Sequence, residues 1–192
     1  YLKNKEGRCT EVAIAVSASP FFYLKTICIK EVFMKVVKRC GDYADYDVEK
    51  IHKVVEWATR DINGVSLSDI EMNMNLSMRD GISTEEIHQI LIKSASDLIS
   101  ESTPNYQYVA ARLLNMSLRK SVWRSCTPPD LYHYIHLMCD NGIYDENILD
   151  GWSREEVDEV QKHIKHDRDD MFTYSGLQQL VDKYLIKNRV TG

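Results

Sequence analysis

The sequence predicts a mainly α-helical (α+β) protein, in which a four-helix bundle is capped by a small β-hairpin or three-stranded sheet and followed by an all-helical segment. Apolar residues recur at helical spacing in several segments, and most of these segments begin with a capping residue. A short β-branched segment with a glycine turn precedes the first of them. We expect the bundle with its hairpin to occupy residues 34–124, and the helical segment to occupy 125–192.

The hairpin is predicted at the start of the bundle. Val36 and Val37 are β-branched and have basic residues on both sides, and Cys40-Gly41-Asp42 is a turn signal before Tyr43 to Tyr46. Further along the chain, Ile82 follows an Asp-Gly turn and is a candidate for a third short strand.

The first three helices of the bundle are predicted from their capping residues. Asp47 is a suitable N-cap for a helix over 48–60, and Ser66 for one from Leu67 to about Met78. Ser83 and Glu86 form a Ser-x-x-Glu capping box before a broad apolar stripe that ends near Ile99.

The fourth helix is expected to begin with Thr103 as its N-cap and Pro104 in its first position, and to end near Trp123. Pro128-Pro129 then marks a boundary. Three helices are predicted after it, over Asp130 to Cys139, Ser153 to about His166, and Ser175 to Tyr184, with a short strand at Leu185 to Lys187.

Composition excludes some functions. The net charge of -5 and the pI near 5.7 argue against a general nucleic-acid binder, which needs an excess of Lys and Arg. Five cysteines without a CxxC pair indicate a reducing, cytoplasmic setting. Residues 1–33 contain no membrane span, and we expect them to lie upstream of a natural start at Met34 or to be disordered.

The basic hairpin is the strongest candidate for chemistry. Lys38 and Arg39 lie beside a glycine turn, and Lys50 lies in the first turn of the following helix. Free N–H groups at a helix start favour phosphate, so these groups are able to converge on one anion. The alternative is that Lys38 and Arg39 are solvated charges that protect an edge strand from aggregation.

Two other groups of residues were weighed as sites. Cys126, His133, His136 and Cys139 have the residue types of a zinc site, but the apolar residues between them favour an ordinary packed helix. His163 and His166 lie among lysines and acidic residues, a pattern that favours a solvated, ion-paired face over acid/base catalysts.

Four segments of the bundle carry a family resemblance: VVKRCG, DVEKIHKVVEWA, DGISTEEIHQILIKSASDLIS and TPNYQYVAARLLNMSLRK. In this order and spacing they resemble the ATP-cone at the N-terminus of the large subunit of class Ia ribonucleotide reductases. The resemblance continues through PPDLYHYI, NGIYD and FTYSGLQQLVDKYLIKNRVTG, the helical lead-in to that enzyme's catalytic barrel. The segment KHDRDDMFTYSG is similar to phage versions of this reductase subunit.

The resemblance implies a regulatory nucleotide site that takes ATP as activator and dATP as inhibitor, with Mg²⁺. It implies Lys38, Lys50 and Lys120 on the phosphates, and Thr84 and His88 on the base and sugar side. The full set of implied nucleotide-binding residues is Lys38, Arg39, Asp47, Val48, Glu49, Lys50, Thr84, His88 and Lys120.

Two positions depart from the family pattern. Ala44 stands where the hairpin often has a Glu, and Ser117 stands where a His linked to inhibition is found. We therefore expect nucleotide binding without the inhibitory response to dATP.

None of the five cysteines matches the family's catalytic cysteines, so the resemblance implies a regulatory piece of an oxidoreductase rather than its catalytic part. The implied enzyme makes deoxyribonucleotides for DNA replication. Its implied partners are the remainder of the large subunit and the radical-generating small subunit, in an oligomeric enzyme. The alternative is a free-standing ATP-cone regulatory module.

Overall fold

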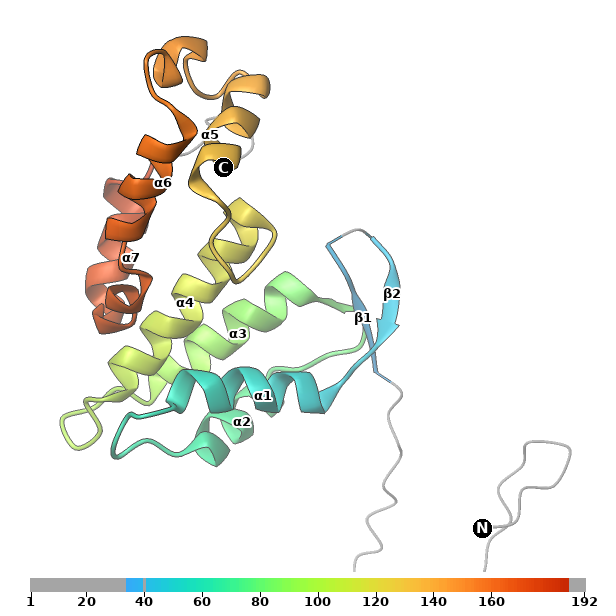
Figure 1. Ribbon diagram of the computed structural model, residues 1–192. Coiled ribbons are helices and arrows are strands. Elements are labelled where there is room, and N and C mark those ends of the chain that lie inside the picture. The colour runs from blue at the N-terminus through green and yellow to red at the C-terminus, as the bar shows by residue number, and fades with distance from the viewer. Residues whose placement is uncertain (1–33, 40, 187–192) are drawn as a thin grey trace, which may run out of the picture. The chain divides into compact units, whose positions relative to one another are not determined.

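The computed structural model describes residues 34–39 and 41–186. A small mixed sheet opens this part of the chain. Strand β1 (Lys35–Val37) pairs antiparallel with β2 (Tyr43–Asp45) and parallel with β3 (Ile82–Ser83), so the order is β2-β1-β3. Figure 1 shows the sheet at the ends of α1 and α3 where these helices begin. The predicted hairpin and the third strand at Ile82 are confirmed.

Four helices pack into the predicted bundle. They are α1 (Val48–Thr59), α2 (Leu67–Asn75), α3 (Thr84–Asp97) and α4 (Tyr106–Trp123). Helix α4 packs against both α1 and α3, and α2 lies against α1 and α3. The mainly α fold with a capping sheet is therefore as predicted.

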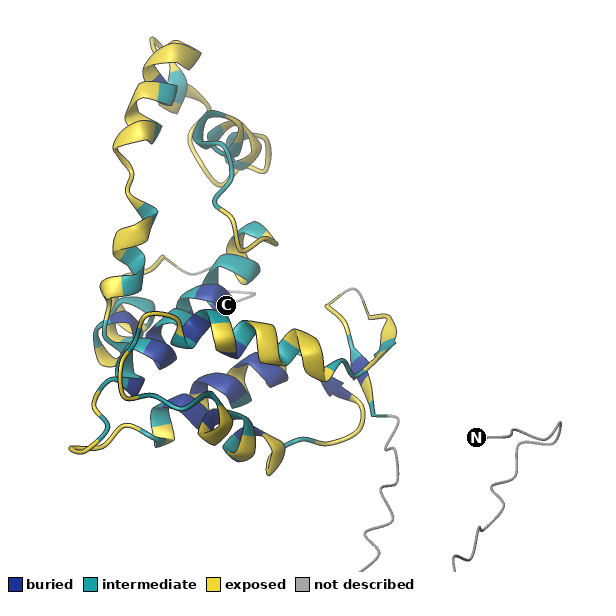
Figure 2. Ribbon diagram, turned by 60° about the horizontal axis from the view of Figure 1, so that its bottom comes forward, coloured by how far each residue is buried: buried dark blue, intermediate teal, exposed yellow. Residues whose placement is uncertain are grey.

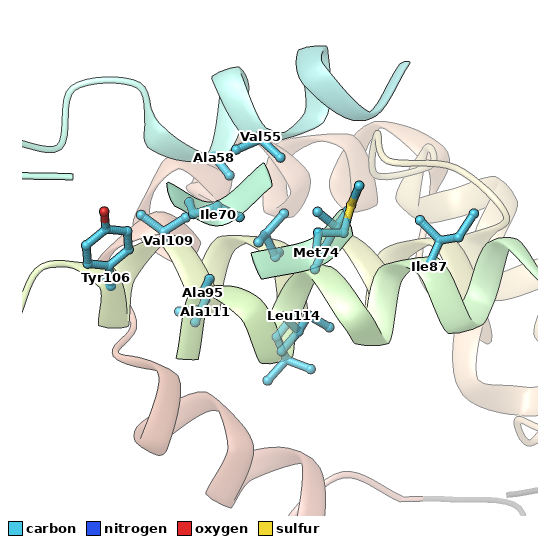
Figure 3. Packing of buried hydrophobic residues seen from close by; sticks show 14 of the residues in the cluster. Val55, Ala58, Ile70, Met74, Ile87, Ala95, Tyr106, Val109, Ala111 and Leu114 are labelled. Carbon is cyan, nitrogen blue, oxygen red and sulfur yellow. The ribbon is translucent and has the colours of Figure 1, made fainter. Parts of the chain in front are cut away.

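The core lies among these four helices and reaches the sheet through Val36 and Ile82. Figure 3 shows Ile70 and Met74 of α2 lying between Val55 of α1 and the residues of α3 and α4. Figure 2 shows that most buried positions belong to this bundle. Tyr106 is buried at the start of α4, where its hydroxyl accepts a hydrogen bond from Ser66 N at 2.8 Å and so ties α4 to the start of α2.

The segment after the bundle is helical and sparsely buried. It contains α5 (Leu131–Asp140), η1 (Glu146–Leu149), α6 (Arg154–His163), η2 (His166–Met171) and α7 (Tyr174–Lys183), where η marks a 3₁₀ helix. Helix α7 packs on α4, and its Leu177 joins the bundle's core. Helix α5 has no buried residue, and α6 buries only Val157. None of the helices within 34–39 and 41–186 is long and apolar enough to cross a membrane.

The predicted start of the fourth helix is wrong by two residues. Helix α4 begins at Tyr106, and its N-cap Asn105 makes no side-chain capping bond. The Thr103 hydroxyl instead donates to Leu98 O at 2.8 Å, so it satisfies a carbonyl at the end of α3. Thr103, the predicted N-cap of α4, therefore hydrogen-bonds the C-terminal end of α3 instead.

Several helix ends also differ from the predictions. Helix α2 ends at Asn75 rather than near Met78, and α6 ends at His163, after which η2 begins separately. Helix α7 begins one residue early because Thr173 is its cap. Leu185 and Ile186 form no strand, since Leu185 N donates to Leu180 O at 2.9 Å and closes α7. Residues 1–33, Cys40 and Lys187 lie outside the described residues, and the expectations for them stay predictions.

Candidate functional site

The hairpin turn holds the first two predicted binding residues. Lys38 N donates to Asp42 O at 2.8 Å, and Gly41 N donates to Lys38 O at 2.9 Å. Gly41 has φ +89°, a left-handed conformation that favours glycine. Lys38 and Arg39 follow β1 directly and are both exposed. The turn thus presents two cations at the rim of the sheet.

The start of α1 forms as predicted, but its lysine is engaged locally. Asp47 is the N-cap, and its carboxylate accepts from Lys50 N at 3.3 Å. The same carboxylate lies 3.2 Å from Lys50 Nζ, and these interactions with Lys50 hold the pKa of Asp47 below its usual value. Val48 and Glu49 are exposed in the same turn, and Glu49 pairs loosely with Lys53 at 4.0 Å.

The start of α3 is fixed by the predicted capping box. Ser83 Oγ accepts from Glu86 N at 3.1 Å, and Glu86 Oε2 accepts from Ser83 N at 3.0 Å. Because Ser83 also ends β3, the box locks the sheet to the first turn of α3. Thr84 is the first residue of this helix, and His88 follows one turn later. His88 is buried, with 9% of its surface exposed.

Lys120 places an ammonium group from the end of α4 next to His88 at the start of α3. It lies in the last turn of α4, and its Nζ is 3.0 Å from His88 Nε2. An ammonium group can only donate, so Nε2 accepts and the imidazole proton belongs on Nδ1. Nδ1 is buried and has no hydrogen-bond partner among the described residues. The contact therefore fixes His88 as a neutral ring whose second nitrogen is left for another group.

The electrostatics of His88 show how much positive charge gathers here. Burial, followed by the positive charges of Lys120 and Arg39, lowers the pKa of His88 to about 4. The hairpin cation Arg39 therefore acts on the same ring as Lys120, although the two residues lie on elements far apart in the sequence. Lys120 lies in contact with His88 rather than with an acidic residue of its own helix.

The structure thus brings together part of the predicted set. Arg39, His88 and Lys120 converge beneath the hairpin, and Thr84 lies one turn before His88. Over the described residues, no hydrogen bond or ion pair joins the side chains of Lys38, Lys50 or Thr84 to this cluster. A cavity of about 330 Å³ lies elsewhere, between α1, α4 and the segment after α4, and none of its lining residues belongs to the predicted set.

Sequence reasoning missed Arg119 and Asp169. Arg119 is the neighbour of Lys120, and its Nη2 donates to Asp169 Oδ2 at 2.6 Å. The only signal available was a pair of adjacent basic residues at a helix end and a run of acidic residues in 167–170, which is too common a pattern to indicate a contact.

Comparison with known proteins finds a family model that is similar to the bundle and its hairpin. Residues 34–121 match the family described as the ATP cone domain, and this range includes the hairpin, all four bundle helices up to Ser121 and every predicted binding residue. The similarity to an ATP cone therefore covers the hairpin and the four-helix bundle. Within this matched range, called the cone below, the hairpin is the β1–β2 unit, and the last helix, α4, supplies Lys120.

Curated relatives of the cone and its extension are reductase subunits. The chain is 43% identical over 157 residues to ribonucleoside-diphosphate reductase 1 subunit alpha of Salmonella typhimurium, and the match covers 82% of this chain and 21% of the relative. It is 40% identical over 161 residues to ribonucleoside-diphosphate reductase subunit alpha of Enterobacteria phage T4, with coverage of 83% and 21%. The chain spans about a fifth of the length of these relatives.

Cys126, His133, His136 and Cys139 are the residues weighed as a zinc site. No group of three or more His, Cys, Asp or Glu within the described residues is placed to hold a metal ion. His133 and His136 are exposed on α5, where the ring of His136 packs edge-on against Tyr132 at 4.5 Å between centroids. Cys126 is exposed in the segment after α4.

Proposed function

We propose that the cone of this chain binds ATP and dATP beneath its hairpin and that the chain is a regulatory part of a ribonucleoside-diphosphate reductase large subunit. The observation that carries the nucleotide proposal is the gathering of two positive charges, those of Lys120 and Arg39, around the neutral ring of His88. Like charges held close together repel one another, and a polyanionic ligand removes that penalty.

The ends of two helices add to this preference for an anion. Helices α1 and α3 both begin at the sheet, and the free N–H groups of a helix start carry partial positive charge. Asp47 and Ser83 each satisfy one of these groups, which leaves others in the first turns. Triphosphate oxygens are suitable partners for the remaining N–H groups and for Lys38, Arg39 and Lys120. The polar edge of His88 then faces the sugar side.

The contacts of Lys50 assign it a conditional role. Its ammonium is largely exposed and lies 3.2 Å from Asp47 Oδ2, so it already has an ion-pair partner without a ligand. Binding a phosphate requires Lys50 to leave Asp47, which costs little because exposed ion pairs contribute about 0 to 1 kcal/mol. Any Mg²⁺ is expected to arrive on the nucleotide, since no acidic cluster for a metal exists among the described residues.

Calorimetry on the 192-residue chain tests the site. We expect ATP and dATP to bind, and the double variant Lys38→Ala with Lys120→Ala to weaken binding more than about a hundredfold, because each charge-assisted contact contributes about 1.5 to 3 kcal/mol. The matched control is Lys93→Ala with Lys183→Ala, which removes the same charge from two exposed lysines outside the predicted set. Equal affinities of the two double variants would exclude the proposed site.

The reductase assignment rests on the reach of the similarity. The alignments to reductase alpha subunits cover 82% of the chain, so they extend beyond the cone into the helical segment after it. This extension favours a reductase piece over a free-standing cone module. In the proposed enzyme, the chain acts with the remainder of the large subunit and with the radical-generating small subunit, and nucleotide occupancy biases their assembly.

The response to dATP is proposed to be weak. Ala44 is half-buried on β2 opposite Val36, and Ser117 is buried on α4 one turn before Lys120. Neither side chain is able to supply the charged or imidazole group that the family pattern places there. We expect dATP to bind with an affinity similar to that of ATP but not to shut off a reductase assembled with this chain. An activity titration showing strong dATP inhibition contradicts this expectation.

A further inference from the structure

The last turn of α4 makes contacts in two directions through adjacent residues. Lys120 Nζ lies 3.0 Å from His88 Nε2 on the cone side. Arg119 Nη2 lies 2.6 Å from Asp169 Oδ2, which belongs to η2 in the segment after the cone. The turn of helix that presents one group to the candidate nucleotide site is therefore also anchored to the following segment.

The anchor is a compact, partly buried cluster. Only 16% of the Arg119 side chain and 34% of the Asp169 side chain are exposed. The Arg119 guanidinium lies 5.9 Å from the centroid of the Trp123 ring, and the edge of His166 meets the same ring at 6.3 Å between centroids. His166 Nδ1 is 3.5 Å from Asp169 Oδ2, so η2 holds the carboxylate in place from its own side.

Much of the segment after the cone is sparsely buried. Helix α5 buries no residue and α6 buries Val157 alone, whereas α7 packs on α4 through buried Leu177 and the partly buried Tyr174 and Leu180. Segments with little buried apolar surface open at a small fraction of the free energy of global unfolding. The partly buried Arg119–Asp169 ion pair and the contact of His166 with Trp123 attach η2 to α4, and a ligand that acts on the last turn of α4 can bias the ion pair.

We propose that Arg119 and Asp169 are positioning residues for Lys120, and that their ion pair couples nucleotide binding in the cone to docking of residues 166–183 on α4. The proposal rests on the nucleotide site described above. Phosphates that engage Lys120 order the last turn of α4, and this order favours the Arg119–Asp169 contact. Because coupling between two sites is reciprocal, loss of the ion pair must weaken nucleotide binding.

Calorimetry with MgATP on the 192-residue chain tests the coupling. We expect Asp169→Asn to raise the Kd about fivefold, the lower end of common coupling strengths. Asp170→Asn is the matched control, because it removes the same charge from the neighbouring residue, which has no ion pair in the described part of the chain, and we expect its Kd to change by less than about twofold. Asp169→Glu keeps the charge and is expected to restore most of the affinity.

Hydrogen exchange on the wild-type chain supplies a readout that a purely structural role would not move. We expect MgATP to slow amide hydrogen exchange in residues 166–183 and to leave the exchange rates in α5 unchanged. None of the predicted nucleotide-binding residues lies in 166–183. Equal Kd values for Asp169→Asn and Asp170→Asn, or unchanged exchange in 166–183 at saturating MgATP, would overturn the coupling while leaving the nucleotide site intact. A wild-type chain that binds no ATP overturns the proposed function itself.

Discussion

Lys120 Nζ lies 3.0 Å from His88 Nε2, across the antiparallel contact between the end of α4 and the start of α3. This contact joins two residues that are 32 positions apart in the sequence. It keeps the imidazole neutral, leaves its Nδ1 without a partner in the described residues, and holds an ammonium group next to the hairpin cation Arg39.

Removing Lys120 is expected to raise the pKa of His88. Burial is the largest cause of its depressed pKa of about 4, and the charge of Lys120 is the second, so Lys120→Ala leaves the value between about 4 and the ordinary 6.5. NMR titration of the histidine ring measures it. Lys93→Ala, which removes an exposed lysine of the same helix as His88, is the control. An unchanged His88 pKa in Lys120→Ala contradicts the electrostatic coupling.

The stability of the chain is expected to depend on pH through His88. Because the folded-state pKa lies below the unfolded value of 6.5, the unfolded state binds more protons between about pH 6.5 and pH 4. The contribution of the neutral ring is therefore present above pH 6.5 and is lost as the pH falls toward 4, by up to about 3 kcal/mol.

Urea unfolding at pH 7 and pH 4.5 checks this contribution. His88→Gln keeps a polar side chain that does not titrate, so it is expected to lose less stability than the wild type across the same interval. Carboxylates titrate equally in both proteins, and the difference between them isolates His88. Parallel losses in the two proteins would show that His88 is not responsible.

Tyr106→Phe is expected to destabilise the bundle by about 1 to 3 kcal/mol, because it leaves Ser66 N without the hydroxyl that accepts its hydrogen bond. Tyr106 is 2% exposed, so water does not readily replace the lost group. Tyr108→Phe is the control, since this half-buried neighbour makes no hydrogen bond through its hydroxyl among the described residues. The free energy of unfolding from urea melts measures both variants, and equal losses would contradict the role of the Ser66 contact.

Local signals in the sequence predict the elements well, because capping is a contact between neighbours. Asp47, Ser66 and Ser83 cap the helices for which their side chains were predicted. The start of α4 was misplaced because the Thr103 hydroxyl has two possible partners close in sequence, and the carbonyl of Leu98 binds it.

Local sequence patterns predict the candidate nucleotide site less well than they predict the helices and strands. The contacts of Lys120 with His88 and of Arg119 with Asp169 cross 32 and 50 residues, and they depend on how α4 packs rather than on any local pattern. Family resemblance placed His88 and Lys120 in one site, whereas spacing alone left Lys38 and Arg39 open to interpretation as solvated charges. Arg119 and Asp169 became visible only in the packed structure.

The central claim is that ATP binds beneath the hairpin, with its phosphates on Arg39 and Lys120 and its sugar side at His88. The ring resonances of the six histidines report on it directly. Negative charge near a neutral imidazole stabilises its protonated form. Saturating MgATP is therefore predicted to shift the His88 signals and raise its pKa from about 4, while His163, exposed at the end of α6, stays unchanged. His88 signals and a His88 pKa that do not move at saturating MgATP would contradict the account.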